Sequence, residues 1–454
     1  MIVRGPVRAG PDRSAEDRTV PPVEEPVLAD TADTIEPPTG GRSIAALVRR
    51  GSAAGGAMVA PFAQALSSLA LQVIAVRELG ADGFGVYALL YSGIVMAMAL
   101  SNGLVGDSLT VLDRSRPTLR GGVTVVGWIS TAATGLLGLL GAGISGIVSW
   151  PLAALFALGL MAFLVENLLR RVLMAVLQFW KVVAIDLTVL VGTLGWIGGA
   201  AIVRTGSLGM GDVLGALLAG QIAGIVSGTA LLPAAERWLG DRKRSRPEIG
   251  DIVRFGSWRA AQQAVRPSSL FGIRIVVIAA VGATVFGELE AARVYTAPAM
   301  LLSNGAATFY LAAFSSGRGQ SRRQLLRRAD IGAIALGVAL LAVGAAAVGL
   351  IPIGDRLVAG GEFDLSAVAV GGWVAYAWAC AVMMPYASLN SVHGRHALMV
   401  GMRVIEAAAS TVAVAVLVAL DVDVSWVPLA MTAGPLILIP IARWQVIHRA
   451  IIEP

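Results

Sequence analysis

About twelve apolar segments, each long enough to cross a lipid bilayer, follow one another from residue 43 onward. The hydrocarbon core of a bilayer is about 30 Å thick and needs roughly 20 helical residues to span it. Backbone polar groups inside that core must hydrogen-bond within the protein, which favours helices. We therefore predict an all-α membrane protein with spans near 53–76, 84–111, 122–148, 152–169, 182–203, 212–233, 253–281, 289–313, 329–353, 365–387, 398–420 and 425–445.

The composition supports this class and excludes several others. Hydrophobic residues make up 56% of the 454 residues and charged residues 14%, against about 45–50% and 25% in soluble domains. The net charge of +6 does not indicate nucleic-acid binding, because the basic residues lie at the ends of apolar segments. Cys380 is the only cysteine, and the histidines lie in or beside connecting segments. We therefore expect neither a disulfide framework nor a metal or cofactor site.

Four regions follow from the pattern along the chain. Residues 1–42 are rich in proline and lack aromatic residues, so they are predicted to form a disordered cytoplasmic tail. Residues 43–233 and 253–454, called here the first half and the second half, are each predicted to form a six-helix bundle. The basic segment 234–252 is predicted to join them as a cytoplasmic linker.

The distribution of basic residues predicts the orientation in the membrane. Lysine and arginine concentrate on alternate connections between the spans, whereas Arg77, Arg204 and Arg356 lie on the opposite side. Cytoplasmic loops of membrane proteins carry an excess of lysine and arginine. With twelve spans, this asymmetry predicts that both termini are cytoplasmic.

A short repeat relates the two halves. Gly80–Gly85 reads GADGFG and Gly282–Gly287 reads GATVFG, so both match the pattern G-A-x-x-F-G. Each copy follows the first span of its half, and the first glycines are 282 − 80 = 202 residues apart. A duplicated unit with an even number of spans gives parallel repeats, related by an axis along the membrane normal.

The segment around the first copy resembles a known family. RELGADGFGVYALLYS, residues 77–92, resembles the oligosaccharide flippase (Wzx-like) branch of the multidrug/oligosaccharidyl-lipid/polysaccharide exporter superfamily. In that branch an arginine-leucine-glycine loop precedes F-G-x-Y-A-L, and the matching residues are Arg77, Leu79, Gly80, Phe84, Gly85, Tyr87, Ala88 and Leu89. Weaker similarities lie at residues 353–367 and 391–400. The likeness covers roughly residues 45–445 in layout.

The resemblance implies a function. Members of that branch form a V-shaped pair of six-helix bundles around a central cavity, work by alternating access in the bacterial inner membrane, and move a polyprenyl-pyrophosphate-linked sugar to the outer leaflet. It further implies partners among the glycosyltransferases or the polymerase of an envelope polysaccharide pathway. We expect a transporter and not an enzyme, since the sequence has no Walker A motif and no cluster suited to acid–base chemistry.

Three arginines lie inside the seventh predicted span. At about 100° per residue, Arg259, Arg266 and Arg274 fall within roughly 80° of one another on a helix, and Gln262 and Gln263 share their face. An arginine near the bilayer centre costs roughly 3 kcal/mol or more, so it normally faces a bundle interior or a wet cavity. Guanidinium groups bind phosphate bidentately and stay charged. This arginine ladder therefore predicts a site for the anionic head group of a lipid-linked substrate.

Each arginine also has a structural alternative. Arg259 could extend to the cytoplasmic interface, and Arg274 could pair with Glu288 or Glu290. Arg293 either extends the ladder or pairs with Glu290, three residues before it.

Further polar residues interrupt other spans. Gln64, Ser68 and Gln72 recur every four residues in the first span, so this polar stripe either faces the cavity and binds sugar hydroxyls or forms interhelical hydrogen bonds. Arg403 and Glu406 are three residues apart and are expected to neutralise each other.

Candidates for ion or proton coupling lie in spans two, four and five: Asn102, Asp107, Glu166, Asn167 and Asp186. Local pairing with the neighbouring arginines is the alternative role for these groups. The sequence therefore favours a flippase for an anionic lipid-linked glycan. A cation-coupled multidrug exporter of the same superfamily and a non-transporting membrane scaffold of a polysaccharide-synthesis complex remain alternatives.

Overall fold

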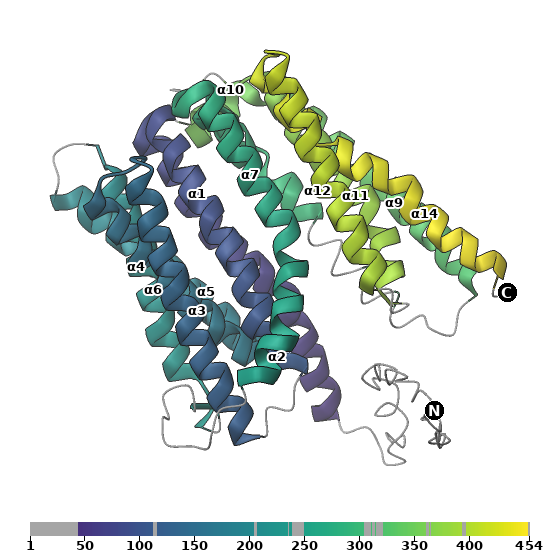
Figure 1. The fold of residues 1–454 in the computed structure, drawn as a ribbon, viewed down its shortest axis with the longest axis horizontal. Helices are drawn as coiled ribbons and strands as arrows, with labels where there is room; N and C mark the ends of the chain where they lie inside the picture. Colours follow the sequence, from purple (N-terminus) through teal and green to yellow (C-terminus); the bar gives the residue numbers. More distant parts are fainter. Residues whose placement is uncertain are drawn as a thin grey trace, which may run out of the picture. The chain divides into compact units, whose positions relative to one another are not determined.

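The computed structural model describes residues 44–111, 116–203, 207–234, 236–237, 249–303, 310, 314, 321–359, 363, 365–392 and 396–452. The predicted tail and most of the predicted linker lie outside these residues. The chain divides into two units, Met1–Arg49 and Arg50–Pro454. The second unit is all-helical in its described residues, as predicted (Figure 1).

The helices of the first half are few in number and mostly long. They are α1 (Ile44–Ser101), the π-helix η1 (Asn102–Gly106), α2 (Asp107–Val111), α3 (Pro117–Ile144), α4 (Trp150–Ala175), α5 (Phe179–Val203) and α6 (Met210–Leu231).

The second half begins with α7 (Ile249–Tyr295), whose start lies inside the predicted linker. The other elements are α9 (Arg322–Gly349), α10 (Ile351–Gly354), the π-helix η3 (Asp355–Ala359), α11 (Ala367–Val392), α12 (His396–Ala419), the 3₁₀ helix η4 (Val424–Trp426), α13 (Val427–Ala430) and α14 (Ala433–Ile452).

Ten helices in the described residues are long and apolar enough to cross a membrane. Val59–Leu109, with 51 residues, is long enough for two passes. Ile249–Tyr295 has 47 residues, of which 295 − 282 = 13 follow Gly282, and further helical residues from 297 to 303 extend its second pass. A single pass needs only about 20 residues. The protein is therefore a multi-pass membrane protein, and the helices account for the predicted number of spans.

Two glycines replace the loops that the sequence predicts between spans one and two and between spans seven and eight. Gly80 has φ 64° and ψ 178° inside α1, and Gly282 has φ 81° and ψ 172° inside α7. Residues with a Cβ rarely adopt this backbone conformation. One glycine therefore suffices to redirect each helix, and the two glycines occupy the same position of the G-A-x-x-F-G repeat.

The two copies of the repeat pack against each other. A Cβ added to Gly85 would clash with the carbonyl oxygen of Ala283, and one added to Gly287 would clash with the carbonyl oxygen of Ala81. The two contacts are reciprocal, because the last glycine of each motif copy meets the alanine carbonyl of the other copy. We call this contact the motif seam. Phe84 and Phe286, the aromatic positions of the motif, are both buried.

The first turns of α7 pack on the first half of the chain. Ile252 is fully buried in a hydrophobic cluster with residues of α2, α3, α4 and α5. Added Cβ atoms would clash at Gly103 with the backbone of Ala260, and at Gly256 with the carbonyl oxygen of Leu104. Later residues of α7 pack against α11 and α12. One helix thus contacts both halves of the chain.

Candidate functional site

A cavity of about 350 Å³ lies between α1, α7, α11 and α13. Its wall is mostly apolar and aromatic, with charged side chains only from α7 among the described lining residues. The charged lining residues are Arg266, Arg274, Glu290 and Arg293. The structure therefore brings two members of the predicted arginine ladder, together with Arg293, to one cavity.

Arg266 enters the cavity from the middle of α7. Its Nη2 lies 3.0 Å from Tyr376 Oη and 3.0 Å from Cys380 Sγ, both on α11. Its Nε lies 3.6 Å from Glu406 Oε1, so Glu406 forms an ion pair with Arg266, while Arg403, the partner that the sequence suggested, also interacts electrostatically with Glu406. The Arg266 side chain is 24% exposed, whereas that of Glu406 is 4% exposed. The guanidinium therefore remains open to the cavity while its counter-ion is enclosed.

Arg274 and Arg293 share one carboxylate. Arg274 donates through Nε to Glu290 Oε1 at 2.8 Å and through Nη2 to Glu290 Oε2 at 3.1 Å. Arg293 donates through Nε to Glu290 Oε2 and through Nη2 to Gln72 Oε1 on α1 at 2.6 Å. The pairing of Arg274 and Arg293 with Glu290, foreseen as an alternative, is present. This pairing leaves one positive charge uncompensated, because two guanidiniums share one carboxylate.

The remaining ladder residues lie elsewhere. Arg259 Nε lies 2.7 Å from Asp107 Oδ2, and Gln263 Nε2 donates to the same oxygen at 2.8 Å. Gln262 Oε1 accepts from Arg259 Nη1 at 3.0 Å. None of these three predicted substrate-binding residues is among the described residues that line the cavity. In this conformation they fasten the start of α7 to α2.

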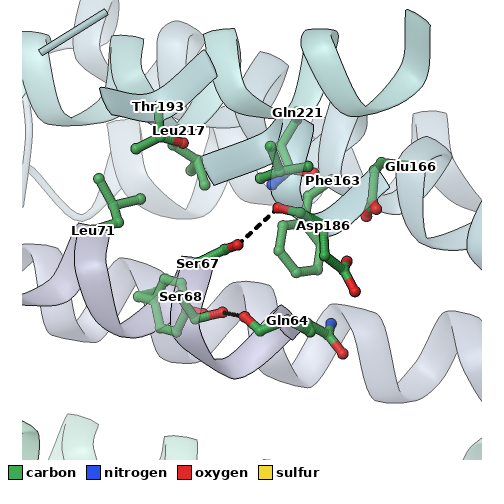
Figure 2. A pocket seen from close by; sticks show the side chains of 12 residues that line it. Gln64, Ser67, Ser68, Leu71, Phe163, Glu166, Asp186, Thr193, Leu217 and Gln221 are labelled. Carbon is green, nitrogen blue, oxygen red and sulfur yellow. Dashed lines mark hydrogen bonds between the residues drawn. The ribbon is translucent and has the colours of Figure 1, made fainter. Parts of the chain in front are cut away.

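The polar stripe of the first span also divides. Gln72 joins Arg293, whereas Gln64 lines a second pocket of about 30 Å³, which has room for roughly one water molecule. Figure 2 shows this pocket, with side chains from α1 facing those from α4, α5 and α6: Gln64, Ser67, Ser68, Glu166, Asp186 and Gln221. Ser67 Oγ donates to the Asp186 carbonyl at 2.9 Å, which ties α1 to α5.

Buried charges surround the second pocket. Arg170 Nε lies 2.9 Å from Asp186 Oδ1 and 3.6 Å from Glu166 Oε1, and all three side chains are almost inaccessible. Two carboxylates and one guanidinium leave this group with a net charge of −1 if all are ionised. Glu166 Oε1 and Gln221 Oε1 have no hydrogen-bond partner among the described residues. The predicted coupling candidates Glu166 and Asp186 therefore lie together.

The other two coupling candidates with amide side chains form a separate contact. Asn167 donates to Asn102 Oδ1 at 2.7 Å, and Arg171 donates to the same oxygen at 2.9 Å. Both asparagines are buried, and the bond from Arg171 to Asn102 matches the alternative of pairing with a neighbouring arginine.

The aromatic wall of the cavity is not apparent from the sequence. Trp373 and Tyr376 on α11 pack edge to face with ring centroids 6.2 Å apart, and Trp373 Nε1 donates to the Leu289 carbonyl at 3.0 Å. Trp373, Tyr376 and Cys380 recur at offsets of three and four, which places them on one helical face. The same spacing is common in an ordinary apolar core, so the sequence alone does not identify these residues as cavity-lining.

Equivalent positions of the repeat differ in charge. An offset of 202 relates Gln64 to Arg266 and Gln72 to Arg274, as it relates Gly80 to Gly282. Each glutamine of the α1 stripe thus has an arginine at the matching position of α7. Equivalent positions of the repeat therefore carry neutral glutamines on α1 and arginines on α7.

Comparison with known proteins finds related folds among solved structures but no related sequence. No protein-family model matches the sequence, and no curated protein matches it. Solved structures do match. A lipid II flippase MurJ in an inward closed conformation has a TM-score of 0.66 and 10% identity, with 86% of each chain covered. A multidrug resistance MATE family transporter of the MOP superfamily in an inward-facing conformation has a TM-score of 0.61 and 12% identity, over 85% of this chain and 94% of that chain.

A third match is a MOP superfamily transporter from Pyrococcus furiosus, described by the reverse polarity of its binding pocket. Its TM-score is 0.60 at 13% identity, over 89% of this chain and 95% of that chain. These identities are too low to transfer a substrate. They show that this multi-pass membrane protein has the fold of transporters of the MOP superfamily.

Proposed function

We propose that the protein is a flippase or exporter that moves a polyprenyl-(pyro)phosphate-linked oligosaccharide, or a related lipid-linked envelope precursor, across the bacterial inner membrane by alternating access. The observation that carries this proposal is the cavity wall formed by α7. Three guanidiniums, from Arg266, Arg274 and Arg293, reach the cavity. In our proposal the two halves act as six-helix bundles, and both termini are cytoplasmic.

The charge of the cavity favours an anionic substrate over a cationic drug. The three arginines are balanced by two carboxylates, Glu290 and Glu406, which leaves a net charge of +1. Arginine offers five N–H donors in a planar arrangement that matches phosphate oxygens. Such a charge in low-dielectric surroundings repels a cation and attracts a phosphate.

The rest of the wall suits the other parts of such a substrate. Trp373, Tyr376 and Phe286 supply aromatic faces beside the arginines, and residues of α1, α7 and α13 add further apolar lining. Aromatic rings and apolar side chains bury the carbon skeletons of sugars and isoprenoid chains. The solved structure named as a lipid II flippase has this fold too, which supports the flippase class. Glycosyltransferases or a polymerase of the same pathway are the proposed partners.

The test uses Arg274→Gln, because Arg293 still neutralises Glu290 in that variant and folding is preserved. Arg443→Gln is the matched control, since Arg443 forms an ion pair with Asp330 away from the cavity. In the native host, we expect Arg274→Gln to accumulate lipid-linked intermediates while the control exports normally. Normal export by Arg274→Gln at normal protein levels would refute the role of the cationic wall.

A cation-coupled multidrug exporter of the same superfamily is the second candidate. It is favoured by the buried group of Glu166, Asp186 and Arg170, whose net charge of −1 a proton or a small cation would neutralise. In a drug-sensitive strain, this candidate predicts resistance from the wild-type protein and loss of resistance in Glu166→Gln. If the wild-type protein confers no resistance, drug export is excluded, and the carboxylates become candidates for energy coupling in the flippase.

A further inference from the structure

We propose that Gln72 is a latch that senses the substrate: an anionic group bound to Arg293 replaces Gln72 as hydrogen-bond acceptor and thereby releases the contact between α1 and α7 at the motif seam. This inference rests on the proposed anionic substrate. It assigns to Gln72 a positioning role that couples binding to opening of the cavity.

Gln72 belongs to a closed set of four side chains. Glu290 holds Arg274 through two hydrogen bonds and Arg293 through one. The fourth member, Gln72, accepts one hydrogen bond from Arg293 Nη2 at 2.6 Å. Gln72 is therefore the only member of the four that lies on α1, and its bond is the one that crosses to α7.

The bond to Gln72 is the weakest link in this set. Both bonds of Arg293 come from an ionised donor, and a charged acceptor adds the Coulomb attraction of an ion pair. Glu290 offers Arg293 a charged acceptor, whereas Gln72 offers a neutral amide oxygen. A phosphate oxygen is also a charged acceptor, so it competes successfully with Gln72 but not easily with Glu290. Binding of a phosphate therefore replaces Gln72 as the partner of Arg293, while Glu290 keeps both arginines in place.

The four side chains lie close to the motif seam. Gln72 and Arg274 each precede the kink glycine of their helix by eight residues, and Glu290 follows Gly282 by eight residues. Eight residues of helix span about 12 Å. At the seam itself, Gly85 and Gly287 approach backbone atoms of the other copy, and the buried side chains of Phe84 and Phe286 belong to the apolar cluster around them. Loss of the hydrogen bond thus removes a polar contact between α1 and α7 next to a seam that is otherwise held by backbone approach and apolar packing.

A substrate in the cavity can reach the arginines. The side chains of Arg274 and Arg293 are 15% and 23% exposed, and both line the cavity. Glu290 is 2% exposed, so it stays behind them. An anion therefore meets the guanidiniums before it meets the carboxylate that positions them.

The experiment measures the motif seam by distance. Cys380→Ser removes the only cysteine of the chain. Spin labels are then attached at Asp82→Cys and Thr284→Cys, which are exposed and occupy equivalent positions of the two motifs. Distances between the labels are recorded for the full chain in lipid nanodiscs, with and without millimolar inorganic pyrophosphate. Calorimetry on the same samples measures pyrophosphate binding.

Two substitutions of residue 72 have opposite expected effects. Gln72→Leu should raise the ratio of long to short distances about tenfold or more without pyrophosphate, because it removes a hydrogen bond to a charged group. Gln72→Glu should keep the short distance even with pyrophosphate, because its carboxylate is a charged acceptor. Gln178→Leu, a substitution of the same kind at the turn between α4 and α5, should behave as the wild type.

The outcomes separate the latch from the proposed function. Lengthening by pyrophosphate in the wild type, together with the two opposite effects at residue 72, supports the inference. If the wild type binds pyrophosphate but the distances are the same in Gln72→Leu and Gln72→Glu, the latch is refuted and the anionic substrate stands. If neither the wild type nor Gln72→Leu binds pyrophosphate, the anionic substrate is refuted, and the latch falls with it.

Discussion

Replacing Arg266 tests whether it serves the substrate or only its neighbour Glu406. Arg266→Met removes the ion-pair partner, at 3.6 Å, of a carboxylate that is 4% exposed. Leaving one partner of a buried ion pair uncompensated costs about 3–5 kcal/mol. We expect the lower end, about 3 kcal/mol, because Arg266 is itself partly open to the cavity and the separation exceeds hydrogen-bond length.

The companion variant Glu406→Gln removes the charge and keeps the shape. Arg266 then retains Tyr376 and Cys380 as partners, so we expect a cost of about 1 kcal/mol. In the double variant Arg266→Met/Glu406→Gln both charges of this ion pair are removed together, and stability should return to within about 1 kcal/mol of the wild type. Denaturant unfolding of the purified protein in detergent micelles measures all three free energies.

Transport by the double variant decides the role of Arg266. If Arg266 binds the head group of the substrate, the double variant is stable but accumulates lipid-linked intermediates in the native host. Export at the wild-type rate by the stable double variant would refute our assignment and leave Arg266 a structural partner of Glu406. If Arg266→Met is as stable as the double variant, the 3.6 Å pair contributes nothing and the energetic argument is wrong.

Three further predictions concern the helix contacts. Gly287→Ala adds a Cβ that clashes with backbone at the motif seam, so we expect a loss of about 1–3 kcal/mol in unfolding free energy; Gly199→Ala, where a Cβ meets nothing within 4 Å, should be neutral or stabilising in the same assay. Gly282→Ala forces a side chain into φ 81°, ψ 172° and should cost about 1–3 kcal/mol by denaturant unfolding, and a cost near zero would refute the strain. Asp107→Asn weakens a partly exposed ion pair with Arg259, so thermal unfolding should show a loss below about 1 kcal/mol, and a larger loss would contradict this interpretation of the pair.

The sequence predicted the fold class because lipid imposes a length and a polarity on each span. It also indicated Glu290 as a partner that Arg293 can reach three residues away on one helix, and that Arg274 can reach across the turn between the two spans. It could not predict that Gly80 and Gly282 turn the chain without a loop. A glycine in a loop and a glycine at a helix kink look alike in sequence, and φ is set by the packing of the spans around it.

The sequence also could not predict which residues far apart along the chain contact each other. Glu406 pairs with Arg266, 140 residues away, although Arg403 is three residues from it. Arg259 shares the helical face of Arg266 as expected, yet it contacts Asp107 because the first turns of α7 pack on the first half of the chain. Helical periodicity fixes which residues share a face, and it does not fix which neighbour each part of a 47-residue helix meets.

The position of the charges on a single helix has a mechanical consequence. Every described arginine that lines the cavity belongs to α7, and α7 contacts the first half of the chain at its start and at the motif seam. Its middle packs against α11 and α12, where Arg266 binds Tyr376. If the seam opens as we propose, an anion bound by these arginines moves with α7, because the matching positions on α1 carry neutral glutamines. The proposal therefore predicts that the substrate stays on the α7 side of the opening cavity.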